Sequence, residues 1–292
     1  MTFNDNADIS SGKVTRRGRN TAIGVGGGGG VIAIIVLLIS AFTGTDLSGL
    51  LGADGQGPAG PEEQLNCTVE QANTDIDCRV QGATAAIDAY WVKKAPDLGI
   101  TYATPSVNIF SGQVQTGCGT ASTAVGPFYC PPDQGIYLDT SFYQQLEQQF
   151  GASAGSLAQM YVLSHEWGHH IQNISGIMEG KDLQDTGPTS DSVRLELQAD
   201  CFAGAWAGAA STTTPEGGGT PFLKTFTDAE LADALNAAAT VGDDNIQEKT
   251  QGQTNPEGWT HGSSEQRQRW FTIGLEQGPE SCNTFEVAGD QL

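Results

Sequence analysis

Two histidines and a glutamate stand close together in the sequence His165-Glu-Trp-Gly-His169. Residues four apart on a helix project from one face, so the imidazoles of His165 and His169 can bind one zinc ion. Glu166 leans towards the same point, where its carboxylate can take a proton from a metal-activated water. The alternative is a surface helix with two ordinary histidines. It is disfavoured because three of the chain's four histidines are His165, His169 and His170.

The third protein ligand has to come from outside this helix. Position 175, where some zinc peptidases carry a third histidine, is Ser175. The segment Glu196-Leu-Gln-Ala-Asp200 follows 27 residues after His169 and again places two side chains four apart. We expect Glu196 to be the third ligand and Asp200 to accept the free N–H of His165. This set predicts one zinc ion per chain, with the fourth position left for water.

Glu196 and Asp200 could instead belong to an acidic, solvent-exposed helix face. The chain has 34 Asp+Glu against 13 Lys+Arg, so such faces are expected. Large apolar or small side chains surround this pair, however, and favour a helix buried against another helix. These neighbours are Leu197, Cys201, Phe202, Ala203, Gly204, Trp206, Ala207 and Gly208.

If the metal-activated water attacks a carbonyl group, the site also needs a hydrogen-bond donor for the oxyanion that develops on the carbonyl oxygen. His261, the only histidine outside the first helix, is our main candidate, and a capping or buried structural histidine is the alternative. Tyr137, Tyr161 and Arg267 are further candidates. We also expect Ile136-Tyr-Leu-Asp139 to form an edge strand on which a peptide can pair, with Tyr137 binding substrate; a plain core strand is the alternative.

The surrounding sequence predicts an α+β domain that is mainly helical, with a small sheet before the active-site helix. Alternating and β-branched residues predict strands over 106–110 and 135–138. Capping residues and apolar periodicity predict the helices. Four expected helices cover residues 84–94, 142–150, 156–174 and 191–210, the last with Ser190 or Asp191 as its cap. A fifth helix is expected to begin after Thr227 and to end near Thr240, and a sixth to begin after Ser263 and to end at Gly278.

Residues 22–42 form an uncharged stretch of 21 residues, which is long enough to cross a bilayer as a helix. Four basic residues precede it, and the next is Arg79, so the positive-inside rule places the N-terminus in the cytoplasm. We therefore expect a cytoplasmic tail over 1–21, a transmembrane helix over 22–42, a flexible linker over 43–63 and an extracytoplasmic domain over 64–292. A cleaved signal peptide is the alternative, and it also exports the domain.

Cysteine usage and charge agree with an exported protein. All six cysteines follow the apolar stretch, and an even number is typical of disulfides in an oxidising compartment. Six cysteines allow 15 pairings, between which the sequence does not choose. We expect Cys67–Cys78, Cys118–Cys130 and Cys201–Cys282, the first two closing short loops. The net charge of -21 argues against a nucleic-acid partner.

The chain resembles the gluzincin metalloproteases, which carry HExxH on one helix and ExxxD on the next. More specifically, it is similar to the bacterial "putative neutral zinc metallopeptidase" family of membrane-anchored proteins with one N-terminal span. The resemblance rests on segments in the same order: Cys118-Gly, Gly126-Pro-Phe-Tyr-Cys-Pro131, Ile136–Asp139, His165–Gln172, Glu196–Gly204, Val241–Asp244 and Thr260–Arg267. It implies a zincin-like domain with endopeptidase-like activity on peptides or proteins, and it implies no particular substrate.

Three functions are compatible with these sequence features. The first is a membrane-anchored peptidase outside the cytoplasm, in which Glu166 is the general base. The second is a catalytically silent scaffold or binding module that keeps zinc for stability; the presence of Glu166 disfavours it, because a structural site needs no base. The third is a zinc amidase that acts on cell-wall peptides with the same three ligands.

Overall fold

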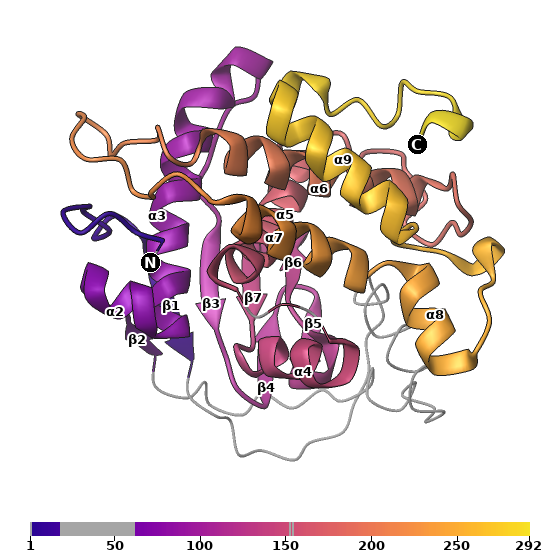
Figure 1. Cartoon of the computed structure of the whole chain (residues 1–292), viewed down its shortest axis with the longest axis horizontal. Helices are drawn as coiled ribbons and strands as arrows, with labels where there is room; N and C mark the ends of the chain where they lie inside the picture. Colours follow the sequence, from indigo (N-terminus) through magenta and orange to yellow (C-terminus); the bar gives the residue numbers. More distant parts are fainter. Residues whose placement is uncertain (1, 18–61, 152, 154) are drawn as a thin grey trace.

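The computed structural model describes residues 2–17, 62–151, 153 and 155–292 (Figure 1). The expected transmembrane helix over 22–42 lies outside these residues, as does the expected linker except for residues 62 and 63. Within the described ranges, no helix is both long and apolar enough to cross a membrane. The expectation of a mainly helical α+β domain is confirmed for this part of the chain.

A five-stranded mixed sheet forms one layer of the domain, in the order β2-β1-β3-β7-β6. The three middle strands are parallel, and each edge strand is antiparallel to its neighbour. A hairpin of β4 and β5 stands apart from this sheet. The bounds are β1 Val14–Arg17, β2 Glu62–Gln64, β3 Ser106–Ile109, β4 Gln113–Thr116, β5 Gly119–Ser122, β6 Phe128–Cys130 and β7 Gly135–Leu138.

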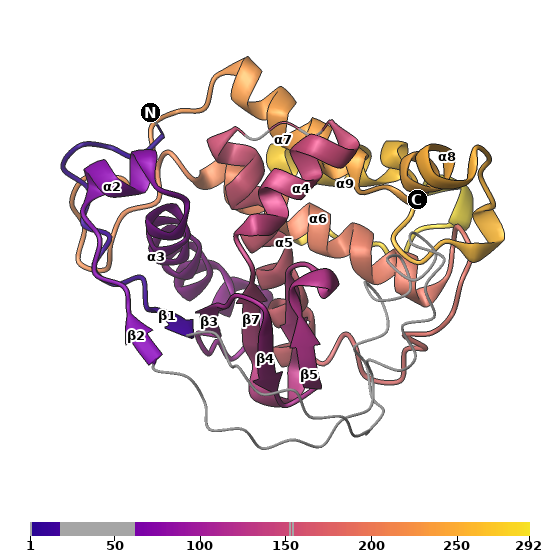
Figure 2. The same cartoon turned by 90° about the horizontal axis from the view of Figure 1, so that it is seen from below.

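The helices gather on one side of the sheet, as Figure 2 shows. Helix α3 packs on β1, and α5 packs on β6 and β7. Helix α6 lies between α5 and α9 and contacts both. The bounds are α2 Val69–Thr74, α3 Ile76–Lys94, α4 Ser141–Phe150, α5 Ser156–Ile174, α6 Asp191–Ala209, α7 Asp228–Thr240, α8 Asp243–Gln251 and α9 Ser264–Gln277.

Residues 2–17 belong to the same folded unit as residues 62–292. Strand β1 occupies the second position in the sheet, and Phe3 is fully buried. The Asn4 side chain donates hydrogen bonds to the carbonyls of Pro221 and Leu223. The sequence predicts a separate tail over 1–21 and a domain that begins at residue 64, and that boundary is wrong because β1 belongs to the sheet. A four-residue strand with two arginines carries no alternating pattern that could have revealed it.

Capping explains why the helices around the site start where the sequence predicts. The Ser190 hydroxyl accepts a hydrogen bond from the amide of Val193 and so caps α6. Thr227 and Ser263 form complete capping boxes at the starts of α7 and α9. Helix α3 starts earlier than expected, at Ile76, where the Asp75 side chain caps it. The short elements α2, β1, β2 and β4 to β6 were not predicted.

Three disulfides link Cys67 to Cys78, Cys118 to Cys130, and Cys201 to Cys282, which confirms the expected pairing. The first two close loops of 11 and 12 residues. The third spans 81 residues and joins α6 to the segment that follows α9. It therefore fixes the C-terminal part of the chain to one of the helices that carry the candidate site.

Glycines let α6 lie unusually close to its neighbours. A Cβ atom at Gly274 of α9 would lie 1.8 Å from the carbonyl oxygen of Cys201, and one at Gly204 of α6 would lie 1.9 Å from that of Phe271. On the α5 side, a Cβ at Gly168 would lie 2.8 Å from the Cα of Ala199. Because the obstructing atoms are mostly backbone, larger residues at these positions would push the helices apart.

We expect Gly274→Ala to lower the free energy of unfolding by about 3 kcal/mol, because the added methyl group overlaps the α6 backbone. Chemical denaturation followed by circular dichroism measures this change. Gly258→Ala is the matched control, since its Cβ would meet only the Asn255 side chain at 3.4 Å. Equal stabilities of the two variants would contradict the close approach of α6 and α9.

Candidate metal centre

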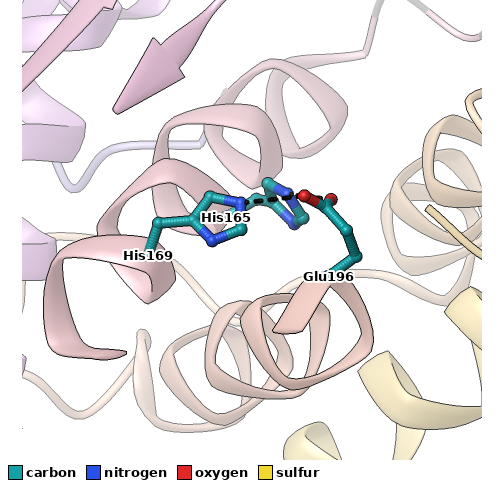
Figure 3. A group of neighbouring side chains, drawn as sticks. All are labelled: His165, His169 and Glu196. Carbon is teal, nitrogen blue, oxygen red and sulfur yellow. Dashed lines mark hydrogen bonds and ion pairs between the residues drawn. The ribbon is translucent and has the colours of Figure 1, made fainter. Parts of the chain in front are cut away.

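Helices α5 and α6 bring His165, His169 and Glu196 together (Figure 3). Nε2 of His165 lies 3.1 Å from one carboxylate oxygen of Glu196, and Nε2 of His169 lies 3.4 Å from the other. One candidate ligand atom from each residue lies within 4.8 Å of the others. The three side chains that the sequence analysis selected as ligands therefore converge on one point.

The partner of Nδ1 sets the tautomer of His165. This nitrogen lies 2.8 Å from a carboxylate oxygen of Asp200, and a carboxylate only accepts hydrogen bonds. Nδ1 therefore carries a proton, and Nε2, which faces Glu196, is the nitrogen that can bind a metal ion once it has lost its own proton. This is the role expected of Asp200, and such a contact orients the ring and raises its basicity.

Asp200 is itself held by two groups behind the site. Nε and Nη2 of Arg267 donate to its two oxygens over 2.7 and 3.0 Å, and the Tyr161 hydroxyl donates to one of them. Burial alone would raise the pKa of Asp200, but the charges of Arg267 and His165 lower it. Arg267 and Tyr161 were candidates for the oxyanion donor; the structure instead bonds both to Asp200, so they position a ligand.

Glu166 lies beside the ligands and is buried, with 6% of its surface exposed. Burial raises the pKa of its carboxyl group, while the charges of His169 and His165 act in the opposite direction. A raised pKa brings a carboxylate closer to the value at which it both takes and returns a proton near neutral pH. These surroundings suit the role of general base that the sequence predicts for Glu166.

His261 also belongs to this centre. Burial would raise the pKa of Glu196, but the charges of His261 and His169 lower it well below its usual range. Nδ1 of His261 lies 2.8 Å from the Thr260 hydroxyl and 3.5 Å from a carboxylate oxygen of Asp243. The other oxygen of Asp243 accepts three backbone N–H groups, from residues 260, 261 and 262, so this loop is fixed.

Tyr137 does not lie where the sequence analysis expected. Strand β7 pairs with β3 on one side and β6 on the other, so the prediction of an edge strand is wrong. The Tyr137 hydroxyl donates to Asp133 over 2.8 Å, and its ring stacks on Phe128 at 5.1 Å. The Tyr137 and Phe128 rings belong to a small apolar cluster around the Cys118–Cys130 disulfide. The edge strand next to β7 is β6, and it packs on α5.

The donor set fits a zinc ion. Two imidazole nitrogens and one carboxylate oxygen are typical of catalytic zinc sites, which keep a fourth position open. Two ligand atoms on a tetrahedral zinc ion lie about 3.3 Å apart. The separations of 3.1 and 3.4 Å between the imidazole nitrogens and Glu196 agree with that value. With one candidate ligand atom from each residue within 4.8 Å of the others, the three side chains lie close enough together to hold one zinc ion.

The sequence of the whole domain matches a known family. The model of the family described as "putative neutral zinc metallopeptidase" matches residues 3–285. The chain belongs to this family. The match starts at residue 3, so it includes the N-terminal segment that carries β1. A family of zinc peptidases agrees with the His/Glu set of the metal centre.

Two relatives illustrate the similarity. "Uncharacterized protein Rv2575" from Mycobacterium tuberculosis (strain ATCC 25618 / H37Rv) is 50% identical over 222 residues, which cover 76% of this chain and 74% of the relative. "Uncharacterized protein YpfJ" from Escherichia coli (strain K12) is 36% identical over 265 residues, covering 89% and 87%. No solved structure matches the chain.

Zinc binding at neutral pH should release protons. In the metal-free chain, burial would lower the pKa of His165, but Asp200 and Glu196 raise it to about 10. Its Nε2 is therefore protonated at neutral pH and has to lose that proton to bind zinc. Zinc affinity should accordingly rise with pH until the pH passes this pKa. Titration calorimetry in buffers of different ionisation enthalpy counts the released protons.

The variant Asp200→Asn removes the carboxylate that contributes most to this raised pKa, so it should release fewer protons on binding zinc. Asp290→Asn, which changes an exposed aspartate near the C-terminus, is the matched control and should release as many as the parent chain. An unchanged proton count in Asp200→Asn would contradict the assignment of Asp200 as the partner of His165.

Proposed function

We propose that this protein is a zinc-dependent peptidase that hydrolyses peptide bonds, with Glu166 as the general base. The convergence of His165, His169 and Glu196, with Glu166 buried beside them, carries this proposal. Membership of a zinc metallopeptidase family supports it. A site that held zinc for stability alone would need the ligands but not a buried, pKa-shifted carboxylate next to them.

Each residue of the proposed site has its own role in hydrolysis. Zinc, when bound, polarises the scissile carbonyl and makes water a better nucleophile. Glu166 takes the proton of the attacking water and passes it to the leaving amine. His261, held at Nδ1 by Thr260 and beside Asp243, can donate from Nε2 to the oxyanion. Asp200, fixed by Arg267, keeps His165 oriented throughout.

An extended peptide is the substrate shape that suits the sheet. Strand β6 ends the sheet of the described residues and packs on α5, the helix that carries His165 and His169. A substrate strand that paired with β6 through its backbone would extend the sheet next to α5. Backbone pairing would also tolerate many side chains, so we expect cleavage of unfolded peptides of varied sequence.

We expect Glu166→Gln to reduce kcat/KM on casein-derived peptides by about 10²–10⁴-fold, because an amide cannot accept the proton from water. The variant should still bind one zinc ion, since the ligands are unchanged. Glu179→Gln, at an exposed glutamate, is the matched control and should retain full activity. Release of cell-wall peptides in place of casein fragments by the parent chain would favour an amidase over a peptidase.

We further propose that the protein works outside the cytoplasm, attached to the bilayer by its N-terminal region. Three disulfides among the described cysteines support an oxidising compartment. The uncharged stretch over 22–42 supports an attachment to lipid. An excess of acidic over basic residues suits contact with the aqueous medium and disfavours nucleic acid as a partner.

The pairing of β1 bears on the orientation of the N-terminus. Strand β1 shares backbone hydrogen bonds with β2 and β3, and hydrogen-bonded strands have to lie on the same side of a membrane. This pairing is at odds with a cytoplasmic N-terminal tail attached to an extracytoplasmic domain. We therefore propose that residues 2–17 lie on the same side of the membrane as residues 62–292.

Thiol labelling of intact cells tests this orientation. We expect a membrane-impermeant maleimide to label Ser11→Cys and Gln253→Cys equally, because both positions are exposed on the same folded unit. The parent chain is the control, since its cysteines are all in disulfides among the described residues. Labelling of Gln253→Cys alone would show that β1 leaves the sheet when the protein is attached to the membrane.

A further inference from the structure

The second imidazole ligand, His169, is held in a different way from the first. Its Nδ1 lies 2.9 Å from the side-chain oxygen of Gln172, one helical turn further along α5. Gln172 is fully buried, so this amide has no water to bond instead. A neutral amide thus stands at His169 where the carboxylate of Asp200 stands at His165.

The orientation of the Gln172 amide follows from its other partners. Its nitrogen lies 2.7 Å from the backbone carbonyl of Leu195 and 3.1 Å from the side-chain oxygen of Gln198. A backbone carbonyl only accepts, so the NH₂ group of Gln172 has to face Leu195 and its oxygen has to face His169. Nδ1 of His169 is therefore the protonated nitrogen, and Nε2 keeps its lone pair for the metal.

Gln198 extends this chain of hydrogen bonds to the C-terminal segment. Its nitrogen donates to the backbone carbonyl of Cys282 over 2.7 Å, which turns its oxygen towards Gln172. Cys282 is fixed by its disulfide with Cys201 of α6. In the series from His169 to Cys282, each residue donates a hydrogen bond to the oxygen of the next one. The last oxygen is the backbone carbonyl of Cys282, which can only accept, so the direction of the whole series is fixed.

We propose that Gln172 and Gln198 are positioning residues that fix the tautomer and ring orientation of His169, and that the Cys201–Cys282 disulfide holds the far end of this hydrogen-bond chain. The proposal rests on the metal centre of the proposed peptidase but not on its activity. It makes assembly of the zinc site depend on a disulfide outside the site. A chain with this disulfide reduced would hold zinc more weakly than the oxidised protein.

Zinc affinity and nuclear magnetic resonance test the role of Gln172 in the full chain. We expect Gln172→Leu to weaken zinc binding by about 10–100-fold, measured by competition with a chelating dye. In the zinc-loaded parent chain, the Nδ1–H protons of His165 and His169 should both give slowly exchanging ¹H–¹⁵N signals. Gln172→Leu should lose the signal of His169 and keep that of His165, which Asp200 holds.

Two further variants separate positioning from packing. Gln172→Glu keeps an acceptor for His169 but loses the donors to α6, so it should retain the His169 signal and near-parental zinc affinity while lowering stability. Gln81→Leu is the matched control. Gln81 lies on α3, is also buried, and makes hydrogen bonds with the backbone N–H of Cys67 and the backbone carbonyl of Ile9. It should lower stability without changing zinc affinity. Equal losses of zinc affinity in Gln172→Leu and Gln81→Leu would overturn the proposal.

Variants that lack a disulfide test the end of the hydrogen-bond series at Cys282. Cys201→Ala with Cys282→Ala should weaken zinc binding, and Gln198→Leu should do the same to a smaller extent than Gln172→Leu, because Leu195 still orients Gln172. Cys118→Ala with Cys130→Ala removes a disulfide near Tyr137 and should leave zinc affinity unchanged. Equal zinc affinities of the two double variants would overturn the role of Cys282.

These outcomes are independent of the proposed function. If the parent chain hydrolysed no peptide but Gln172→Leu lost zinc affinity and the His169 signal, the positioning role would stand and the peptidase proposal would fail. If the parent hydrolysed peptides and Gln172→Leu kept both properties, the positioning role would fail alone.

Discussion

The close packing of α6 between α5 and α9 is the constraint on which the site depends. His165 and His169 belong to α5, while Glu196 belongs to α6, so the ligand set exists only while these helices touch. Glycine at 168, 204 and 274 allows the backbones to approach. The same contact surface carries the buried polar side chains that orient the imidazoles, which explains why so many polar groups lie inside this helix pair.

Buried charge is the second consequence of this packing. Glu166, Glu196 and Asp200 are all nearly inaccessible to solvent, and three carboxylates in such surroundings are costly unless countercharges stand beside them. Arg267 pairs with Asp200, and the charges of the histidines lower the pKa of Glu196. A divalent cation would complete this balance. The positive charge of Arg267 also lies near two of the ligands, because its Nη2 is 4.0 Å from a carboxylate oxygen of Glu196 and 3.5 Å from Nδ1 of His165.

The N-terminal and C-terminal segments both serve to complete this architecture. Residues 2–17 add a strand to the middle of the sheet and bury Phe3 against α3, where Gly82 leaves room for its ring. The segment after α9 is joined to α6 by a disulfide and accepts the hydrogen bond of Gln198. The family match from residue 3 to residue 285 covers both segments, as expected if they are structural parts of the domain.

The sequence by itself determined the local features, because these depend on spacing along one helix or on residues a few positions apart. His165, Glu166 and His169 share a helix whose bounds the sequence predicted correctly, and Glu196 and Asp200 share another. Only the tertiary structure decided which groups meet across elements: Gln172 with Gln198, Arg267 with Asp200, and β1 with β3. Contacts between residues far apart in the chain leave no periodic pattern, so the sequence predicts an edge strand at Tyr137 although this strand is internal.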